Sequence, residues 1–199
     1  MALLIIDPKL NFASLLDKRL ETKYLVLHHA GKEECSVQEI HRWHLARTWA
    51  GIGYNFYVRK NGTIYKGRDW EYAGAHTSIC NSLSIGICFE GNYEKEQFMP
   101  VPQLQAGAYL IADALSRYPS IDTICRHSDA RATECPGKYF PFKRMVEGGK
   151  AGGVLPPQKS EDYPEPTING KDNSVRSVLK TIVLLLLAAL AVTSKVKIP

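Results

Sequence analysis

Apolar residues in the first two thirds of the chain follow two different spacings. Continuous apolar runs at Tyr24–His29 and Leu83–Phe89 have the length and composition of buried strands. Between Pro102 and Tyr118, apolar residues recur at helical spacing, and Pro119 follows directly. A proline at the start and another just past the end are typical of a helix with these bounds. The pattern therefore predicts both strands and helices in one domain.

Further local signals complete the predicted elements. Ser36–Glu39 is an S-x-x-E capping box, which starts a helix. Asn61-Gly62 lies between two strand-like runs, at 55–58 and at 63–66. This dipeptide is typical of a tight hairpin turn. A short strand at 121–125 follows the long helix. These elements predict an α/β (α+β) fold, with a mixed central β-sheet flanked by helices.

The composition changes abruptly after Glu147. Residues 148–166 hold four glycines and four prolines among charged residues, which is typical of a flexible linker. We therefore divide the chain into a folded domain at 1–147, a Gly/Pro-rich linker at 148–176 and a hydrophobic C-terminal segment at 177–199.

The C-terminal segment has two interpretations. Residues 181–192 are strictly apolar, and Lys180 and Lys195 bracket them. With both lysines reaching to the interfaces, residues 177–196 have roughly the length of a membrane-spanning helix. We expect a membrane anchor, because a helix that is apolar all round and carried by a linker has no obvious core to enter. The alternative is a helix packed back onto the domain.

The net charge limits the classes of binding partner, and the cysteine content indicates the cell compartment in which the protein is made. The formal net charge of +5 suits an anionic partner such as a cell wall or a membrane surface. The sequence holds no dense block of lysine and arginine, so we expect no nucleic-acid partner. The five cysteines cannot all pair internally, and no secretory signal precedes Asp7-Pro8. We expect free thiols and synthesis in the cytoplasm.

Three side chains are candidates for a catalytic zinc site. His28 lies at the end of the first long strand, His127 follows the last strand, and Cys135 comes eight residues later. A catalytic zinc takes three protein ligands and leaves one position for water. This pattern alone is moderately specific, because six histidines in 199 residues also form accidental pairs.

The remaining histidines have other interpretations. His41 and His44 lie at i and i+3 of the first predicted helix, and with no carboxylate or cysteine beside them we interpret both as packing residues. His29 points to the opposite face of its strand from His28. His76 lies in a predicted loop, where it suits contact with a substrate better than metal binding.

Six short motifs occur in a fixed order along residues 20–147. They are Val26-Leu27-His28-His29, Gly53-Tyr54-Asn55-Phe56, the run Asn61–Arg68, Trp70 with Gly74-Ala75-His76, Asn81–Ile87, and Thr133-Glu134-Cys135-Pro136-Gly137. Together they resemble the zinc amidase family, which includes phage amidase-type lysozymes and animal peptidoglycan recognition proteins. Each motif is weak by itself, but six in the same order and spacing are specific.

The resemblance implies a reaction and a set of residues. It makes His28, His127 and Cys135 the ligands of one zinc ion. Tyr54 matches a tyrosine that positions or polarises the zinc-bound water. Thr133 falls where phage members often have lysine and many recognition-protein amidases have threonine, which leaves the identity of the oxyanion stabiliser open. The implied reaction hydrolyses the amide between N-acetylmuramic acid and L-alanine in bacterial peptidoglycan.

The resemblance also implies a groove for glycan and stem peptide, for which we expect contacts from Arg68, Trp70, His76 and Asn81. An arginine can bind a stem-peptide carboxylate with two hydrogen bonds. The alternative makes Arg68 a surface charge of the hairpin and Trp70 a core residue. For Glu90, at the end of a predicted strand, we favour a surface role over that of an additional site carboxylate.

Two rival functions remain at the level of sequence. A recognition module would bind peptidoglycan without cutting it, and such domains commonly lack the cysteine ligand, which this chain has as Cys135. A structural zinc site would need a fourth protein ligand, for which Cys125 is the nearest candidate. We expect a monomeric enzyme that acts on the cell wall, either in phage lysis or in bacterial wall remodelling.

Overall fold

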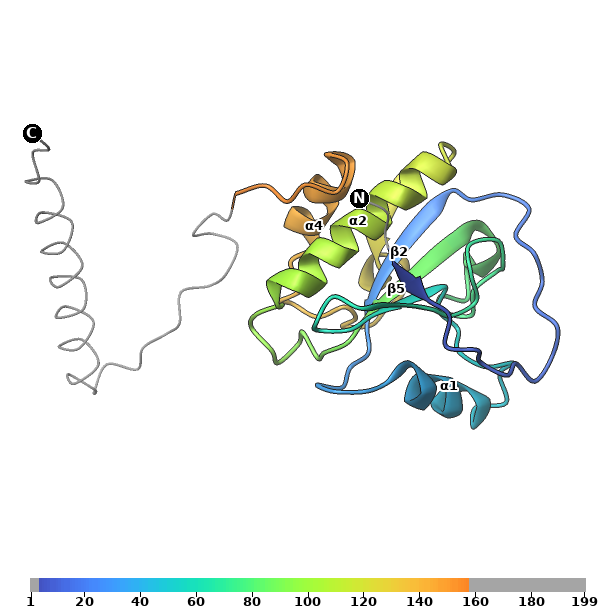
Figure 1. Cartoon of the computed structure of the whole chain (residues 1–199). Coiled ribbons are helices and arrows are strands. Elements are labelled where there is room, and N and C mark those ends of the chain that lie inside the picture. The colour runs from blue at the N-terminus through green and yellow to red at the C-terminus, as the bar shows by residue number, and fades with distance from the viewer. Residues whose placement is uncertain (1–3, 158–199) are drawn as a thin grey trace, which may run out of the picture. The chain divides into compact units, whose positions relative to one another are not determined.

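The computed structural model describes residues 4–157, and residues 1–3 and 158–199 lie outside the described part. Its centre is a six-stranded sheet in the order β1-β4-β3-β5-β2-β6 (Figure 1). The strands are β1 (Ile5–Ile6), β2 (Tyr24–His29), β3 (Phe56–Val58), β4 (Ile64–Lys66), β5 (Ser84–Phe89) and β6 (Thr123–Arg126). The helices are α1 (Val37–Leu45), the 3-10 helix η1 (Asn81–Leu83), α2 (Val101–Arg117), α3 (His127–Ala130) and α4 (Phe142–Lys150).

The sheet is mixed, as the sequence predicts. Strand β2 pairs in parallel with both β5 and β6, and β5 pairs in parallel with β3. Among the six strands of the described region, only β3 and β4, the two arms of the hairpin, pair antiparallel. Because parallel strands end at the same edge of a sheet, the residues that follow β2, β5 and β6 converge there. This edge holds His28, and His127 follows directly after β6.

Helices cover the two faces of the sheet unequally (Figure 1). On one face α2 and α4 pack together over the larger core, which includes Leu25 and Leu27 of β2. On the other face α1 packs over a smaller cluster that includes Ile40 and Cys88. Since side chains alternate along a strand, Leu27 faces the larger core and His28 projects to the α1 side.

Local sequence signals explain where the elements begin. Ser36 Oγ accepts a hydrogen bond from Glu39 N at 3.1 Å, and the Glu39 carboxylate accepts one from Ser36 N at 2.8 Å, which completes the capping box of α1. The predicted hairpin is confirmed, with Gly62 at φ 86° in its turn. A glycine has no steric penalty for this backbone conformation.

The folded part extends beyond the predicted domain boundary at 147. Helix α4 continues to Lys150, and its Gly149 lies so close to α2 that an added Cβ would be 2.3 Å from Ile111 Cγ2. Leu155 also packs against the larger core. The rest of the predicted linker and all of the hydrophobic segment at 177–199 fall outside the described residues. Within residues 4–157, no helix is long and apolar enough to cross a bilayer.

Candidate metal centre

The first candidate ligand, His28, is held at the end of a central strand. Its side chain is 1% exposed. The neighbouring His29 points elsewhere, because its Nδ1 accepts a hydrogen bond from Tyr93 N at 3.0 Å. The structure thus confirms that only the first histidine of the pair faces the candidate site.

The other two candidate ligands lie at the two ends of one loop. Ser128 N, next to His127, donates a hydrogen bond to Cys135 O at 2.8 Å and thereby closes the loop. A cis peptide bond joins Cys135 to Pro136. His29 N lies 3.4 Å from Cys135 Sγ and donates to it, which ties the loop to the end of β2.

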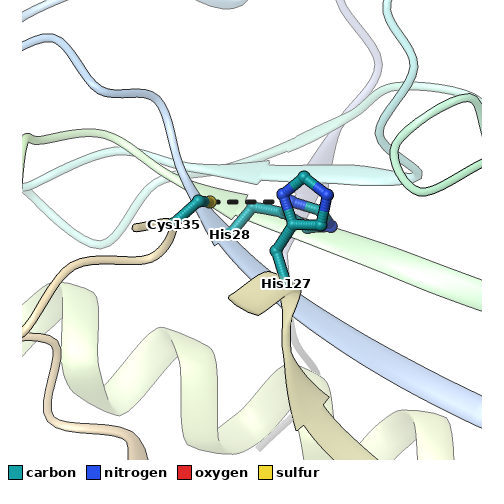
Figure 2. Close-up of side chains that lie close together, drawn as sticks. All are labelled: His28, His127 and Cys135. Atoms are coloured by element: carbon teal, nitrogen blue, oxygen red, sulfur yellow. Dashed lines mark hydrogen bonds between the residues drawn. The ribbon is translucent and has the colours of Figure 1, made fainter. Parts of the chain in front are cut away.

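The three side chains come together as the sequence predicts (Figure 2). One ligand atom from each of His28, His127 and Cys135 lies within 4.8 Å of the others. His28 Nδ1 is 3.8 Å from Cys135 Sγ, and the rings of His28 and His127 have centroids 4.5 Å apart. No other group of three or more His, Cys, Asp or Glu side chains within residues 4–157 has this arrangement.

The electrostatics of the group favour neutral side chains in the absence of a cation. Burial lowers the pKa of His28 well below its ordinary value, and it also lowers the pKa of His127, with Arg131 as a second cause. Burial raises the pKa of the Cys135 thiol to about 12. Neutral imidazoles are the form that binds zinc, and a bound cation would strongly favour the thiolate.

Two observations indicate that the three candidate ligands suit a zinc ion. His127 Nε2 is buried, and no other atom of the described residues hydrogen-bonds to it. Buried polar atoms without a partner are rare and call for a bound ion or water. The donor set of two imidazoles and one thiol is also one that zinc commonly takes in catalytic sites.

Tyr54 and Thr133 lie beside the three candidate ligands. The Tyr54 ring is 5.1 Å from that of His28, and its hydroxyl hydrogen-bonds to the Cys88 side chain. Burial, with Cys88 and Cys135 as further causes, raises the pKa of Tyr54 well above its ordinary value, so this hydroxyl keeps its proton. Thr133 is exposed, and its Oγ1 accepts a hydrogen bond from Cys135 N at 3.3 Å.

The two histidines of α1 are packing residues, as expected. His41 Nδ1 accepts a hydrogen bond from Ile52 N at 3.1 Å, and His44 Nδ1 accepts one from Gly53 N at 2.9 Å. These bonds fasten α1 to the segment that leads into Tyr54. Both histidines are therefore part of what positions Tyr54, although neither belongs to the candidate metal group.

His76 and Asn81 are brought to the site, but in different ways. His76 is 7% exposed, and its Nδ1 lies 3.1 Å from Nε2 of His28. Asn81 Oδ1 accepts hydrogen bonds from His76 N and Thr77 N, at 2.9 and 2.8 Å. Both side chains line a pocket of about 280 Å³, together with Trp49, Thr77 and Arg131 among others.

Arg68 and Trp70 lie apart from that pocket. The Arg68 side chain is 8% exposed and donates to Ile52 O at 2.8 Å and to Ala73 O at 3.0 Å. Trp70 packs in the larger core, with its ring 4.2 Å from that of Phe56. These contacts are structural, and the substrate contacts expected for the two residues stay predictions.

Two residues of the pocket, Trp49 and Arg131, have no role in the sequence-based predictions. Trp49 follows α1, and its ring is tilted against that of His44, at 4.7 Å between centroids. Arg131 lies in the loop between the candidate ligands His127 and Cys135. Their proximity in sequence to the Gly53-Tyr54 motif and to the ligand loop is the signal that could have found them.

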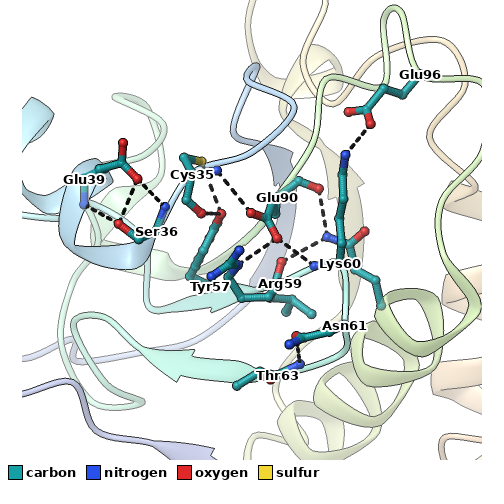
Figure 3. A network of polar contacts seen from close by, with 12 residues as sticks. Cys35, Ser36, Glu39, Tyr57, Arg59, Lys60, Asn61, Thr63, Glu90 and Glu96 are labelled. Carbon is teal, nitrogen blue, oxygen red and sulfur yellow. Dashed lines mark hydrogen bonds and ion pairs between the residues drawn. The ribbon is translucent and has the colours of Figure 1, made fainter.

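Glu90 is neither on the surface nor in the metal group (Figure 3). It is 1% exposed and accepts hydrogen bonds from Arg59 Nε and Lys60 N, both at 2.8 Å, and from Cys35 N at 3.1 Å. Burial opposes its ionisation, but these bonds outweigh burial and lower the pKa of Glu90. The expected surface role is therefore wrong, and Glu90 joins the hairpin to the start of α1.

The match to a known protein family lies within the described part of the chain. The family model described as N-acetylmuramoyl-L-alanine amidase matches residues 18–138. That range includes all three candidate ligands together with Tyr54 and Thr133.

Both kinds of relative expected from the motifs are found. Peptidoglycan-recognition protein SC2 of Drosophila melanogaster is 38% identical over 125 residues, which cover 57% of this chain and 67% of that protein. The endolysin of Klebsiella phage KP32 is 31% identical over 138 residues, 65% of this chain and 89% of the endolysin. Among solved structures, the N-acetylmuramoyl-L-alanine amidase LysC from Clostridium intestinale URNW aligns with a TM-score of 0.71 and 34% identity, over 75% of this chain and 98% of LysC.

Proposed function

This chain belongs to the N-acetylmuramoyl-L-alanine amidase family, and we propose that it hydrolyses the amide between N-acetylmuramic acid and L-alanine of peptidoglycan with one zinc ion. The observation that carries this proposal is the convergence of His28, His127 and Cys135 within 4.8 Å. A recognition protein without catalysis has no need of a complete ligand set.

The chain's own residues have separate parts in the reaction. Zinc, when bound, supplies a Lewis acid and an activated water at neutral pH. Tyr54 and Thr133 donate hydrogen bonds to the oxygen of the scissile carbonyl as it gains negative charge. Burial keeps the proton on Tyr54, and the backbone contact at Thr133 Oγ1 leaves its own hydrogen free to donate.

The pocket beside His76 is the proposed place for the stem peptide. Arg131 provides its positive charge, and a guanidinium can form two hydrogen bonds with a peptide carboxylate. Trp49 provides an apolar wall next to it. The pocket adjoins the metal group through His76, which contacts His28. A peptide bound there would extend from the scissile amide along the pocket.

The decisive experiment is mass analysis of purified peptidoglycan after digestion with the full chain. We expect stem peptides with a free N-terminal alanine, whose release stops after chelation and resumes when zinc is returned. Binding to the wall without any release would instead assign the chain to non-catalytic recognition. Release that continues at full rate after complete removal of the metal would contradict the role of zinc.

A further inference from the structure

His76 lines the pocket, and its ring also makes two contacts that neither metal binding nor substrate contact explains. Its ring is buried and lies against the candidate ligand His28. One ring nitrogen, Nδ1, is 3.1 Å from His28 Nε2. The other, Nε2, is 3.4 Å from Ser84 Oγ. His76 thus joins a ligand to the first residue of β5.

The hydrogen bond that Ser84 Oγ donates determines the direction of the other hydrogen bonds between Ser84, His76 and His28. Ser84 Oγ donates its only hydrogen to Cys80 O, at 2.6 Å, so it can only accept from His76. His76 therefore carries its hydrogen on Nε2, and in a neutral imidazole Nδ1 is then an acceptor.

The same logic extends to the ligand. Because His76 Nδ1 accepts, His28 Nε2 must be the donor, and His28 Nδ1 has no hydrogen. That bare nitrogen is the atom that lies 3.8 Å from Cys135 Sγ, on the side of the metal group.

The His76 ring cannot easily turn away from this arrangement. A Cβ at Gly74 would lie 2.2 Å from His76 Cδ2, and one at Gly86 would lie 2.4 Å from the same atom. The imidazole therefore lies in a slot between Gly74 and Gly86, and it occupies space that a side chain at either position would need. Asn81 Oδ1 fixes the backbone by accepting from His76 N at 2.9 Å.

We propose that His76 is a positioning residue, which holds His28 in the tautomer with hydrogen on Nε2 and so keeps Nδ1 available to zinc. This inference rests on the proposed function for its link to zinc, but not for the tautomer itself. The outer partner of a zinc-bound histidine is usually a carboxylate, a carbonyl or water. A neutral histidine orients the ligand without adding negative charge, which leaves more of the positive charge on the metal.

Two substitutions at this position separate hydrogen bonding from packing. His76→Phe fills the slot but has no acceptor, and we expect zinc affinity to fall about 10- to 100-fold, the usual effect of losing an outer partner. His76→Asn places an amide oxygen near the position of Nδ1, and it should restore most of the affinity. His41→Phe is the matched control, because His41 is a buried histidine with an accepting Nδ1 that does not touch a ligand.

The measurements are zinc affinity by competition with a chelator and the tautomer of His28 by nitrogen NMR of the metal-free full chain. We expect hydrogen on Nε2 of His28 in the wild type and in His76→Asn, and a shift toward Nδ1 in His76→Phe. Hydrogen on Nδ1 in the wild type would overturn the inference, as would undiminished zinc affinity in folded His76→Phe. If His76→Phe does not fold, the test rests on the tautomer of His28 in the wild type and on the zinc affinity and tautomer measured for His76→Asn.

The outcomes also separate this inference from the proposed function. A wild-type chain that binds no zinc contradicts the proposed function, while its His28 tautomer still tests the role of His76. Conversely, a chain that binds zinc and cleaves peptidoglycan with His28 in the other tautomer keeps the function and removes the role of His76.

Discussion

Cys135 Sγ lies 3.8 Å from His28 Nδ1, although the two residues are 107 positions apart in the chain. The contact depends on the parallel pairing of β2 with β6, which brings the residues after β6 to the end of β2. It also depends on the hydrogen bond from His29 N to Cys135 Sγ. Sheet topology and one backbone donor thus place a thiol where a strand-end histidine can share a cation with it.

Replacement of this thiol separates cleavage from binding. In Cys135→Ala, we expect loss of stoichiometric zinc and of peptidoglycan cleavage, because two imidazoles alone make a much weaker site. Sedimentation with purified cell walls should be largely retained, because the pocket with Arg131 is intact. Cys125→Ala is the control, since Cys125 lies outside the metal group, and it should keep both zinc and activity. Undiminished cleavage by Cys135→Ala would remove Cys135 from the ligand set.

The Tyr54 hydroxyl is expected to act on the reaction and not on the metal. Tyr54→Phe should lower kcat about 100- to 1,000-fold, the usual cost of one oxyanion donor, with zinc content unchanged. Tyr57→Phe removes a different buried hydroxyl, which donates to Cys35 O at 2.6 Å, and should lower the melting temperature without a comparable loss of kcat. Equal kcat for Tyr54→Phe and the wild type would show that this hydroxyl does not act in catalysis.

Arg68 and Arg131 should respond differently to the same change. Arg68→Met leaves the carbonyls of Ile52 and Ala73 without their donors, and we expect about 2–4 kcal/mol less unfolding free energy in urea. Arg131→Met alters an exposed side chain, so stability should hold while KM for peptidoglycan rises. A higher KM with unchanged stability in Arg68→Met would instead support the substrate contact expected from the motifs.

His44 is expected to make the fold sensitive to acid. Burial, followed by Arg47 and Arg68, lowers the pKa of His44 from 6.5 to about 4. Between these two pH values the unfolded chain takes up a proton that the folded chain does not, so folding stability falls as the pH falls. His44→Asn keeps an acceptor for Gly53 N but does not titrate. The stability of the wild type relative to this variant should therefore decrease from pH 6.5 to 4, and a constant difference would contradict the shift.

The hydrophobic segment at 177–199 remains a predicted membrane anchor. The full chain should sediment with membranes after lysis, whereas a chain ending at residue 157 should stay in the supernatant. Residue 157 is the better end point than 147, because α4 and Leu155 belong to the folded core. Equal distribution of the two chains would rule the anchor out.

The sequence was sufficient to predict the order of the main elements and the convergence of the three candidate ligands. His28, His127 and Cys135 follow strands or close a loop, and such positions depend on local signals and on motif order. The S-x-x-E box and the Asn-Gly turn are likewise local, and both lie where they were expected.

Local sequence motifs did not predict contacts between segments that are far apart in the chain. The role of His76 depends on Ser84 and on the space left by Gly86, and neither can be inferred from the loop that holds His76. Glu90 was expected at the surface because it follows a strand, but the hairpin and the segment before α1 close over it. Side-chain direction and burial at element ends are set by tertiary packing.

The order of the ligands along the chain determines when the site can first exist. His28 is made early, whereas His127 and Cys135 follow β6, the strand at the edge of the sheet that is made last. A nascent chain or a proteolytic fragment that stops before residue 127 holds one ligand of the three. Such a chain lacks two of the three candidate ligands, so under the proposed function it has no cleaving activity until nearly the whole domain has been made.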